Sequence, residues 1–185
     1  MQAIRWSVRR SHIAPLPTSL HTAIEADLQA IGLIDLRSRQ WGYRGIIPES
    51  ALAALEVEER TDHWRAMLQP GGRALALVAA VDGRPVGFAA WQDDGGDLGA
   101  ELLALYVLEE ASGTGVARDL EQAALRQMSS SGHERAFLWV LQENGRARRF
   151  YERAGWKADG AMKVITRCGV ELVSVRYRQT HGLPG

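Results

Sequence analysis

The sequence has 185 residues, 46% of them hydrophobic and 24% charged, and its 22 basic side chains are balanced by 22 acidic ones. A neutral chain of this kind is a poor candidate for binding duplex nucleic acid, because neutralising phosphates needs a net basic surface. The single cysteine, Cys168, excludes an internal disulfide framework, and no run is long and apolar enough for a signal peptide or a membrane span. We therefore expect one cytoplasmic domain over residues 1–185, ordered at about 4–178 and ending in a tail at 179–185.

The N-terminal third is predicted to be mostly helical. Ile4–Arg9 alternates apolar and polar residues and indicates a half-buried first strand. Gly32 is a plausible end for a helix whose apolar residues recur at helical spacing, namely Leu20, Ile24, Leu28 and Ile31. Residues 34–45 show no clear period and predict a loop. A second helical region starts at Ile47-Pro48-Glu49, and its charged middle at Glu56–Arg60 is a potential break.

From residue 74 the apolar pattern becomes that of β-strands. Ala74–Val81 and Val86–Trp91 are joined by Asp82-Gly83-Arg84, which is a good hairpin signal. A turn-rich loop and a third strand, Leu98–Val107, follow. Three successive strands of this sort predict an antiparallel meander.

The last third alternates helices and strands. A helix follows the meander, with one stripe formed by Val116, Leu120, Ala123, Ala124 and Met128, and it ends at Ser129–Gly132. Ala136–Leu141 is apolar almost throughout, as in a strand buried on both faces. Asn144 can cap the next helix and Gly155 can end it. Two last strands are predicted at about Ala161–Thr166 and Val170–Arg178.

The stretch Leu102–Leu120, LLALYVLEEASGTGVARDL, leads from an apolar strand into a helix through a loop that contains Gly113 and Gly115. Free backbone N–H groups at the positive end of a helix dipole can hold phosphate. The loop is not a Walker loop, since no Gly-Lys-Ser/Thr follows, and it lacks the third glycine of a dinucleotide fingerprint. Taken alone, such a loop is more often a simple strand-to-helix turn.

A second motif, Asn144–Trp156 with the sequence NGRARRFYERAGW, changes this interpretation. With Ser112–Ala117 (SGTGVA) it resembles the GCN5-related N-acetyltransferase (GNAT) superfamily, whose members carry Gln/Arg-x-x-Gly-x-Gly/Ala and later Asn-x-x-Ala-x-x-Phe-Tyr-x-x-x-Gly-Phe. Ser112 stands where Gln or Arg is typical, and Trp156 replaces the usual Phe. The positions that match are Gly115, Ala117, Asn144, Ala147, Phe150, Tyr151 and Gly155.

The resemblance extends from Ile4 to Arg178 and implies the GNAT fold, an α/β (α+β) architecture. That fold has a mixed central sheet of six to seven strands, an antiparallel meander plus a splayed parallel pair, flanked by about four helices. It implies acetyl-CoA as co-substrate, without a metal. The thioester and pantetheine would lie along Leu105, Tyr106 and Val107, and Asn144 would hydrogen-bond the cofactor, cap its helix, or do both. The pyrophosphate would lie on Ser112, Gly113, Thr114, Gly115, Val116, Ala117 and Arg118.

Chemistry sets the catalytic requirements. A lysine-like amine has a pKa near ~10.4 and must lose a proton before it attacks a thioester, and the departing thiolate must gain one. By resemblance Tyr151 is the candidate donor to the thiolate, although it could simply pack beside Phe150. Glu101 is a candidate base acting through water, with the strand parity of Leu103, Leu105 and Val107, although it could equally be an exposed charge.

Other residues carry weaker signals. The segment Arg37–Arg44 borders the acceptor groove in relatives and is the expected specificity element, unless Trp41 and Tyr43 only fill the domain edge. The histidines lack metal-ligand spacing. One arginine of the second motif could approach a phosphate, although a solvated helix face is the commoner role of such a set, here Arg146, Arg148, Arg149 and Arg153.

The function implied is transfer of acetyl from acetyl-CoA to a primary amine, preferably of a small molecule. A protein N-terminus or lysine is the second candidate acceptor, and a catalytically idle acyl-CoA sensor is the alternative from another class. No nucleic-acid or membrane partner is expected, and a homodimer is possible.

Overall fold

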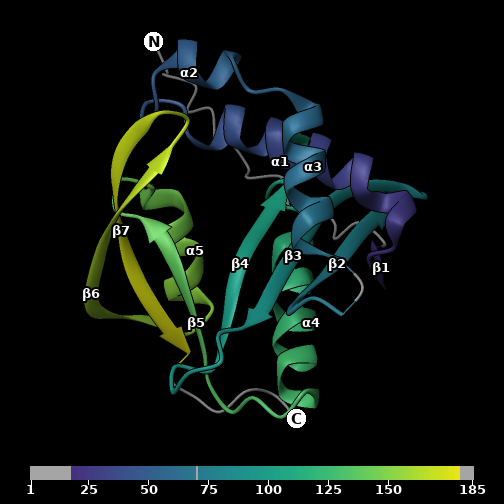
Figure 1. Ribbon diagram of the computed structural model, residues 1–185, viewed down its shortest axis with the longest axis vertical. Helices are drawn as coiled ribbons and strands as arrows, with labels where there is room; N and C mark the ends of the chain where they lie inside the picture. Colours follow the sequence, from purple (N-terminus) through teal and green to yellow (C-terminus); the bar gives the residue numbers. More distant parts are fainter. Residues whose placement is uncertain (1–17, 70, 180–185) are drawn as a thin grey trace, which may run out of the picture.

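The computed structural model of the protein describes residues 18–69 and 71–179. Its strands form one mixed seven-stranded sheet in the order β1-β2-β3-β4-β5-β7-β6 (Figure 1). Every neighbouring pair is antiparallel except β4 and β5. The strands are β1 Thr18–Thr22, β2 Ala74–Val81, β3 Arg84–Asp93, β4 Ala100–Val107, β5 Ala136–Leu141, β6 Trp156–Arg167 and β7 Val170–Gln179. The expected mixed sheet with a meander and one parallel pair is confirmed.

The described residues form five α-helices rather than about four, because the N-terminal helical region is divided into three. They are α1 Leu28–Gly42, α2 Glu49–Ala53, α3 Val57–Met67, α4 Val116–Ser130 and α5 Gly145–Arg153. None of these helices combines the length and the apolar character needed to cross a membrane.

Helices cover both faces of the sheet (Figure 1). On one face α4 and α5 pack over a core that includes Leu77, Trp91 and Leu138. On the other face α1 and α3 pack over Val78 and Phe88. A third apolar cluster joins the α1–α2 connection to the β6–β7 hairpin. The space between β4 and β5 is thus bounded by helices on both sides.

The N-terminal part differs most from the sequence-based expectation. The strand expected at Ile4–Arg9 lies outside the described residues. The helix expected from Leu20 begins only at Leu28, because Leu20 belongs to β1, which pairs with β2 from Thr18↔Val81 to Thr22↔Leu77. Ile24 precedes a short 3-10 turn and is exposed. Hydrogen bonding to a neighbouring strand here overrides an apolar spacing that also fits a helix.

Gly32 does not end a helix; it lies inside α1. A Cβ added there would lie 2.8 Å from the backbone nitrogen of Thr61 and 2.9 Å from its Cα, so the glycine lets α3 pack directly against α1. The loop expected at residues 34–45 is likewise wrong up to Gly42, since α1 continues to that residue. The second helical region does break, but just before the expected place: α2 ends at Ala53 and α3 begins at Val57, so Glu56–Arg60 is helical after its first residue.

The C-terminal elements follow the predicted order closely. Strands β2 and β5 coincide with their predicted ranges, and the Asn144 side chain caps α5 by accepting a hydrogen bond from Ala147 N at 3.0 Å. Gly155 has φ 91°, as a helix-ending glycine should. Trp156 begins β6 and donates its indole N–H to the buried Glu121 of α4 at 2.8 Å. The indole N–H that Trp156 adds, compared with the usual Phe, therefore has a hydrogen-bond acceptor inside the protein.

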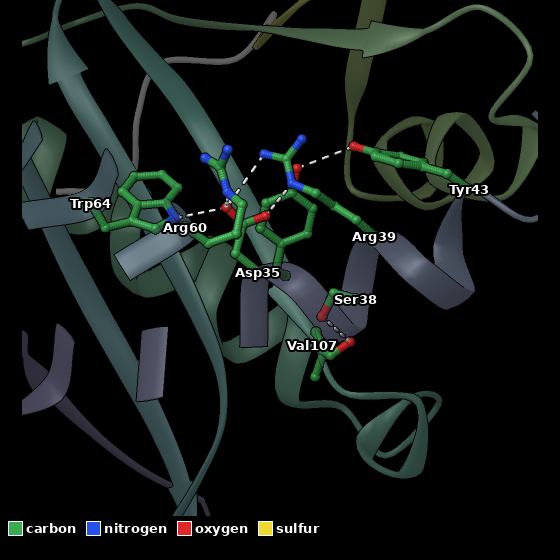
Figure 2. A network of polar contacts seen from close by, with 8 residues as sticks. Asp35, Ser38, Arg39, Tyr43, Arg60, Trp64 and Val107 are labelled. Atoms are coloured by element: carbon green, nitrogen blue, oxygen red, sulfur yellow. Dashed lines mark hydrogen bonds and ion pairs between the residues drawn. The ribbon is translucent and has the colours of Figure 1, made fainter. Parts of the chain in front are cut away.

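A buried ionic cluster joins α1 to α3 (Figure 2). The Asp35 carboxylate has no exposed surface and accepts hydrogen bonds from Arg39, from Arg60 Nε at 3.0 Å and from Trp64 Nε1 at 2.8 Å. Burial alone would raise the pKa of Asp35, but the charges of Arg39 and Arg60 and these hydrogen bonds outweigh it, so the pKa lies below its ordinary value. The Asp35 carboxylate therefore stays charged, and it connects α1 to α3 through its bonds to Arg60 and Trp64.

Asp35→Asn should lower the free energy of unfolding at pH 7 by about 3–5 kcal/mol, because it leaves buried guanidinium charge without its partner. Denaturant titration would measure this. The lowered pKa means that the contribution of Asp35 is present above pH 3.8 and is lost as the pH falls further, so the difference between the proteins should shrink there. Asp62→Asn is the matched control, since its ion pair with Arg65 is exposed and should contribute little. Equal stabilities of Asp35→Asn and wild type would refute the role of the cluster.

Candidate active site

The parallel strands β4 and β5 separate soon after they meet. In the described part of the chain they pair only from Ala100↔Ala136 to Leu102↔Leu138. Beyond Leu102, β4 continues to Val107 along β3, while β5 continues along β7. The edge of β4 that faces β5 therefore has no strand partner from Leu103 to Val107, and its backbone groups can serve a ligand.

The backbone of Val107 faces this open edge. The N–H of the next residue, Leu108, donates to Val86 O at 2.8 Å on the β3 side. Since successive residues of a strand turn their N–H and C=O to opposite edges, those of Val107 point away from β3. The Ser38 hydroxyl of α1 donates to Val107 O at 3.0 Å (Figure 2). The Val107 carbonyl thus accepts a hydrogen bond within the protein, while the Val107 N–H can donate one to a ligand.

A cavity of about 620 Å³ occupies the space between the separated strands. One wall is β4 from Leu102 to Val107, and the opposite wall is β5 from Trp139 to Leu141. The loop before α4, the helix α5 and the C-terminal part of α1 also line it. The expected positions Leu105, Tyr106 and Val107 all lie on its wall.

The glycine loop forms one end of the cavity at the start of α4. Gly113 and Gly115 have φ of 80° and 101°, a conformation that side chains disfavour, and Gly115 is the N-cap of the helix. Five of the seven expected loop residues line the cavity, namely Ser112, Gly113, Gly115, Ala117 and Arg118.

The other two expected loop residues turn their side chains into the protein. The Thr114 hydroxyl donates to Ala111 O at 2.6 Å, and Val116 is fully buried in the α4 core. Their side chains build the loop, so only their backbone could meet a ligand.

Arginines of α5 are closer to this loop than the sequence indicated. Arg146 donates to the Ser112 hydroxyl and lies over the Trp41 ring, with 3.9 Å between its guanidinium carbon and the ring centroid. Arg149 and Arg153 also line the cavity. Arg148 instead donates to Tyr177 and to Gln142 O. Since α5 carries arginines on several faces, the sequence alone does not show which arginine contacts the loop.

Asn144 and Tyr151 also line the cavity. The side-chain oxygen of Asn144 is used as the helix cap, so its amide nitrogen is the part left for a ligand. Tyr151 packs edge-on against Phe150 and Trp156, and its hydroxyl has no hydrogen bond to another described residue. Burial raises the pKa of the Tyr151 phenol, and the nearby Tyr43 and Glu121 raise it further. The phenol is therefore protonated at neutral pH, so it can donate a proton or a hydrogen bond but cannot serve as a base.

Glu101 does not share the face of Leu105 and Val107, and this expectation is wrong. Trp91 pairs with Leu102 and Ala90 pairs with Ala104, which leaves Leu103 as an extra residue in β4. Such a bulge reverses the alternation of faces. Leu105 and Val107 pack on the α4 side, whereas Leu103, Ala104 and Tyr106 pack on the α1 side.

Glu101 lies on the α1 side of the sheet, opposite to Leu102, and accepts a hydrogen bond from Gln92 Nε2 at 3.1 Å. It is not among the residues that line the cavity. Burial raises the pKa of its carboxyl, while the hydrogen bond from Gln92 and the charge of Lys163 act against that rise.

The segment Arg37–Arg44, which the sequence predicts to determine specificity, lies partly on the cavity wall. Trp41 and Tyr43 line the cavity, whereas Arg39 is tied to Asp35 and Arg37 pairs with Glu110 at 3.4 Å. The Tyr43 and Tyr106 hydroxyls lie 3.1 Å apart. Helical structure over Arg37–Gly42 explains why only some of these side chains reach the cavity.

Three further lining residues had no signal in the sequence, because each is set by its strand's place in the sheet. They are Trp139, Arg167 and Ser174. Across residues 18–69 and 71–179, no three His, Cys, Asp or Glu side chains gather in a way that could hold a metal ion.

Comparison with known proteins agrees with this geometry. The model of the acetyltransferase (GNAT) family matches residues 32–156. An uncharacterized N-acetyltransferase of Mycobacterium tuberculosis is 35% identical over 115 residues, which make up 62% of this chain and 72% of the relative.

Solved structures share the fold. That of the PaiA N-acetyltransferase of Thermoplasma acidophilum in complex with coenzyme A has a TM-score of 0.70 at 22% identity and covers 86% of this chain and 98% of that one. That of YncA from Salmonella typhimurium with acetyl-CoA has a TM-score of 0.65 at 19% identity, covering 87% and 92%. The separated strands, the glycine loop on α4 and the family match over residues 32–156 lead to one conclusion: the chain belongs to the GNAT family of acetyltransferases.

Proposed function

We propose that this protein transfers the acetyl group of acetyl-CoA to the primary amine of a small molecule, by direct attack within a ternary complex, and that the chain acts as one domain. The observation that carries the proposal is the cavity between β4 and β5, which is lined by a phosphate-type loop at the start of α4. It is also lined by Tyr43 and Tyr106 beside the β6–β7 hairpin, the part of the cavity that we call the acceptor end. Relatives named N-acetyltransferase and structures solved with CoA or acetyl-CoA support it.

The residues present fit coenzyme A. Backbone N–H groups at the start of the 15-residue helix α4, where the dipole is positive, suit a pyrophosphate. Arg118 and Arg146 flank that loop and add positive charge. Along the open edge of β4, a pantetheine arm would meet backbone groups of Leu105 and Val107. These groups and the amide of Asn144 are the contacts that we propose.

When bound, acetyl-CoA supplies a thioester whose carbonyl carbon accepts the amine. The Val107 N–H on the open edge is placed to hydrogen-bond the thioester oxygen, where negative charge develops. We propose that Tyr151, which lines the cavity and is protonated at neutral pH as a phenol ordinarily is, gives a proton to the departing sulfur.

A base is also needed, because the amine arrives protonated. Glu101 is the carboxylate that we propose, acting through water, since its raised pKa makes it a better proton acceptor than an ordinary glutamate. Its place outside the cavity lining means that a water molecule must bridge it to the amine.

The acceptor end favours a small molecule over a folded protein. The α1–α2 connection and the β6–β7 hairpin pack against each other there, through Tyr43, Ile47 and Leu52 on one side and Ile165 and Val170 on the other. Because the α1–α2 connection and the hairpin are in contact, they leave less room for a polypeptide acceptor than an open groove would. The neutral charge of the chain also offers no acidic surface for a basic peptide.

Thiol release from acetyl-CoA with a panel of amines tests the proposal. We expect turnover with at least one small amine and none without an acceptor. Calorimetry run in parallel should show acetyl-CoA binding. Binding without turnover on any amine or peptide would favour a sensor, turnover only on peptides would favour a protein acceptor, and absence of binding would refute the whole proposal.

Tyr151→Phe should lower kcat by about 100-fold and leave the KM for acetyl-CoA nearly unchanged, because it removes one proton donor without removing a hydrogen bond between described residues. Steady-state kinetics would measure this. Tyr177→Phe is the matched control: its hydroxyl bonds Arg148 and Glu152 away from the cavity, so it should reduce the melting temperature and leave kcat alone. Unchanged turnover in Tyr151→Phe would remove this residue from the mechanism.

Glu101→Gln should change the pH dependence of kcat/KM. In the wild type, activity should fall as the pH drops through the pKa of Glu101, which lies above 4.5, because only the carboxylate accepts a proton. The variant should lose this ionisation and about 100-fold of its rate, keeping only the dependence on the amine itself. The exposed Glu134→Gln serves as control. A profile that matches the wild type would show that solvent or another group takes the proton.

A further inference from the structure

The cavity is unusual in its charge. Among the described residues that line it there are five arginines and no aspartate or glutamate. Four of the five, Arg118, Arg146, Arg149 and Arg153, come from the start of α4 and from α5, the end where coenzyme A phosphates would lie. Arg167 is the fifth, and it needs a different explanation.

Arg167 comes from the acceptor end. It is the last residue of β6 and pairs with Val170 across the hairpin turn. The residues around it, Ile165, Cys168 and Val170, pack on the cluster that includes Tyr43 of the α1–α2 connection. In Figure 1 this turn lies beside α2.

The guanidinium of Arg167 has a buried atom without a partner. Its Nε is buried and makes no hydrogen bond to any described residue, and no described carboxylate forms an ion pair with it. An arginine cannot lose its charge to avoid this cost. By contrast, the buried Arg39 and the partly buried Arg60 share the Asp35 carboxylate. At the acceptor end of the cavity, the guanidinium of Arg167 therefore has N–H donors that are free to bind a ligand.

The field of Arg167 reaches groups at this end. Burial has the largest effect on two pKa values here: it raises that of Tyr106 and lowers that of Lys163. The positive charge of Arg167 lowers the pKa of both groups. Lys163 itself lies over the Trp139 ring, 4.2 Å from its centroid. The surroundings of an acceptor would thus be aromatic and positively charged.

We propose that Arg167 binds a carboxylate of the acceptor, so that the substrate is a small amine that also carries a carboxylate, as an amino acid does. This inference rests on the proposed function and narrows its substrate class. A planar guanidinium matches a carboxylate with two parallel hydrogen bonds. Polyamines and other polycationic amines are disfavoured, because no carboxylate of the cavity lining could receive a second ammonium group.

Matched acceptors test the inference. Each set holds an α-, β- or γ-amino acid, its primary amide, and the amine that lacks the carboxyl group. For the set that fits best, kcat/KM should favour the acid over its amide by about 10- to 100-fold, mainly through KM. Turnover of amides and plain amines as fast as the acids would overturn the inference while leaving the proposed function intact. Absence of turnover on all of them, with acetyl-CoA bound, would instead count against the function.

Variants locate the preference. Arg167→Gln should reduce the ratio between acid and amide to near one, and Arg167→Lys should keep part of it, since the charge remains while the two-pronged geometry is lost. Arg84→Gln, an exposed arginine at the start of β3 that does not line the cavity, should leave the ratio unchanged. Calorimetry should give equal acetyl-CoA affinity for the Arg167 variants and the wild type. Loss of acetyl-CoA binding in either variant would show that Arg167 holds the coenzyme, and would overturn the inference.

Discussion

The separation of β4 from β5 after Leu102 is the constraint on which the rest of the structure depends. Two parallel strands that stayed paired would use the backbone groups on their facing edges for each other and leave no space between them. Because each strand instead keeps a different partner, β3 or β7, the sheet remains continuous while one edge of β4 stays open. The bulge at Leu103 marks the same point, and it turns Glu101 toward the α1 side of the sheet.

An opening in a sheet needs support from both faces. On one face, α4 and α5 bring the glycine loop and the arginines to it. On the other, the Asp35 cluster anchors α1 to α3, and α1 in turn brings the Ser38 hydroxyl to the Val107 carbonyl (Figure 2). The residue after α1, Tyr43, lies beside Tyr106. A buried ion pair of this kind adds little net stability compared with an apolar core, so we interpret its value as positional.

Sequence reasoning worked where a residue's role is local. The Asn144 cap, the glycine loop, and the strands from Ala74 onward depend on neighbours a few residues away, and they were predicted correctly. It failed where a distant partner decides. Gly32 does not end a helix, because the residue without a side chain is needed where α1 contacts Thr61 of α3. Residues 34–42 are helical although their pattern is irregular, because α1 packs on the sheet along one side and buries Asp35 and Arg39 in an ionic cluster.

By itself the sequence determined the family, the order of the elements after residue 74, and the two motifs that frame the cavity, since these follow from short-range geometry and characteristic spacing. Only the tertiary structure decided which side chains share that cavity. A single extra residue in β4 reverses the face of Glu101, and the fold of the β6–β7 hairpin brings Arg167 to the acceptor end from far along the chain. Side-chain direction depends on register and packing across the sheet, which no local pattern records.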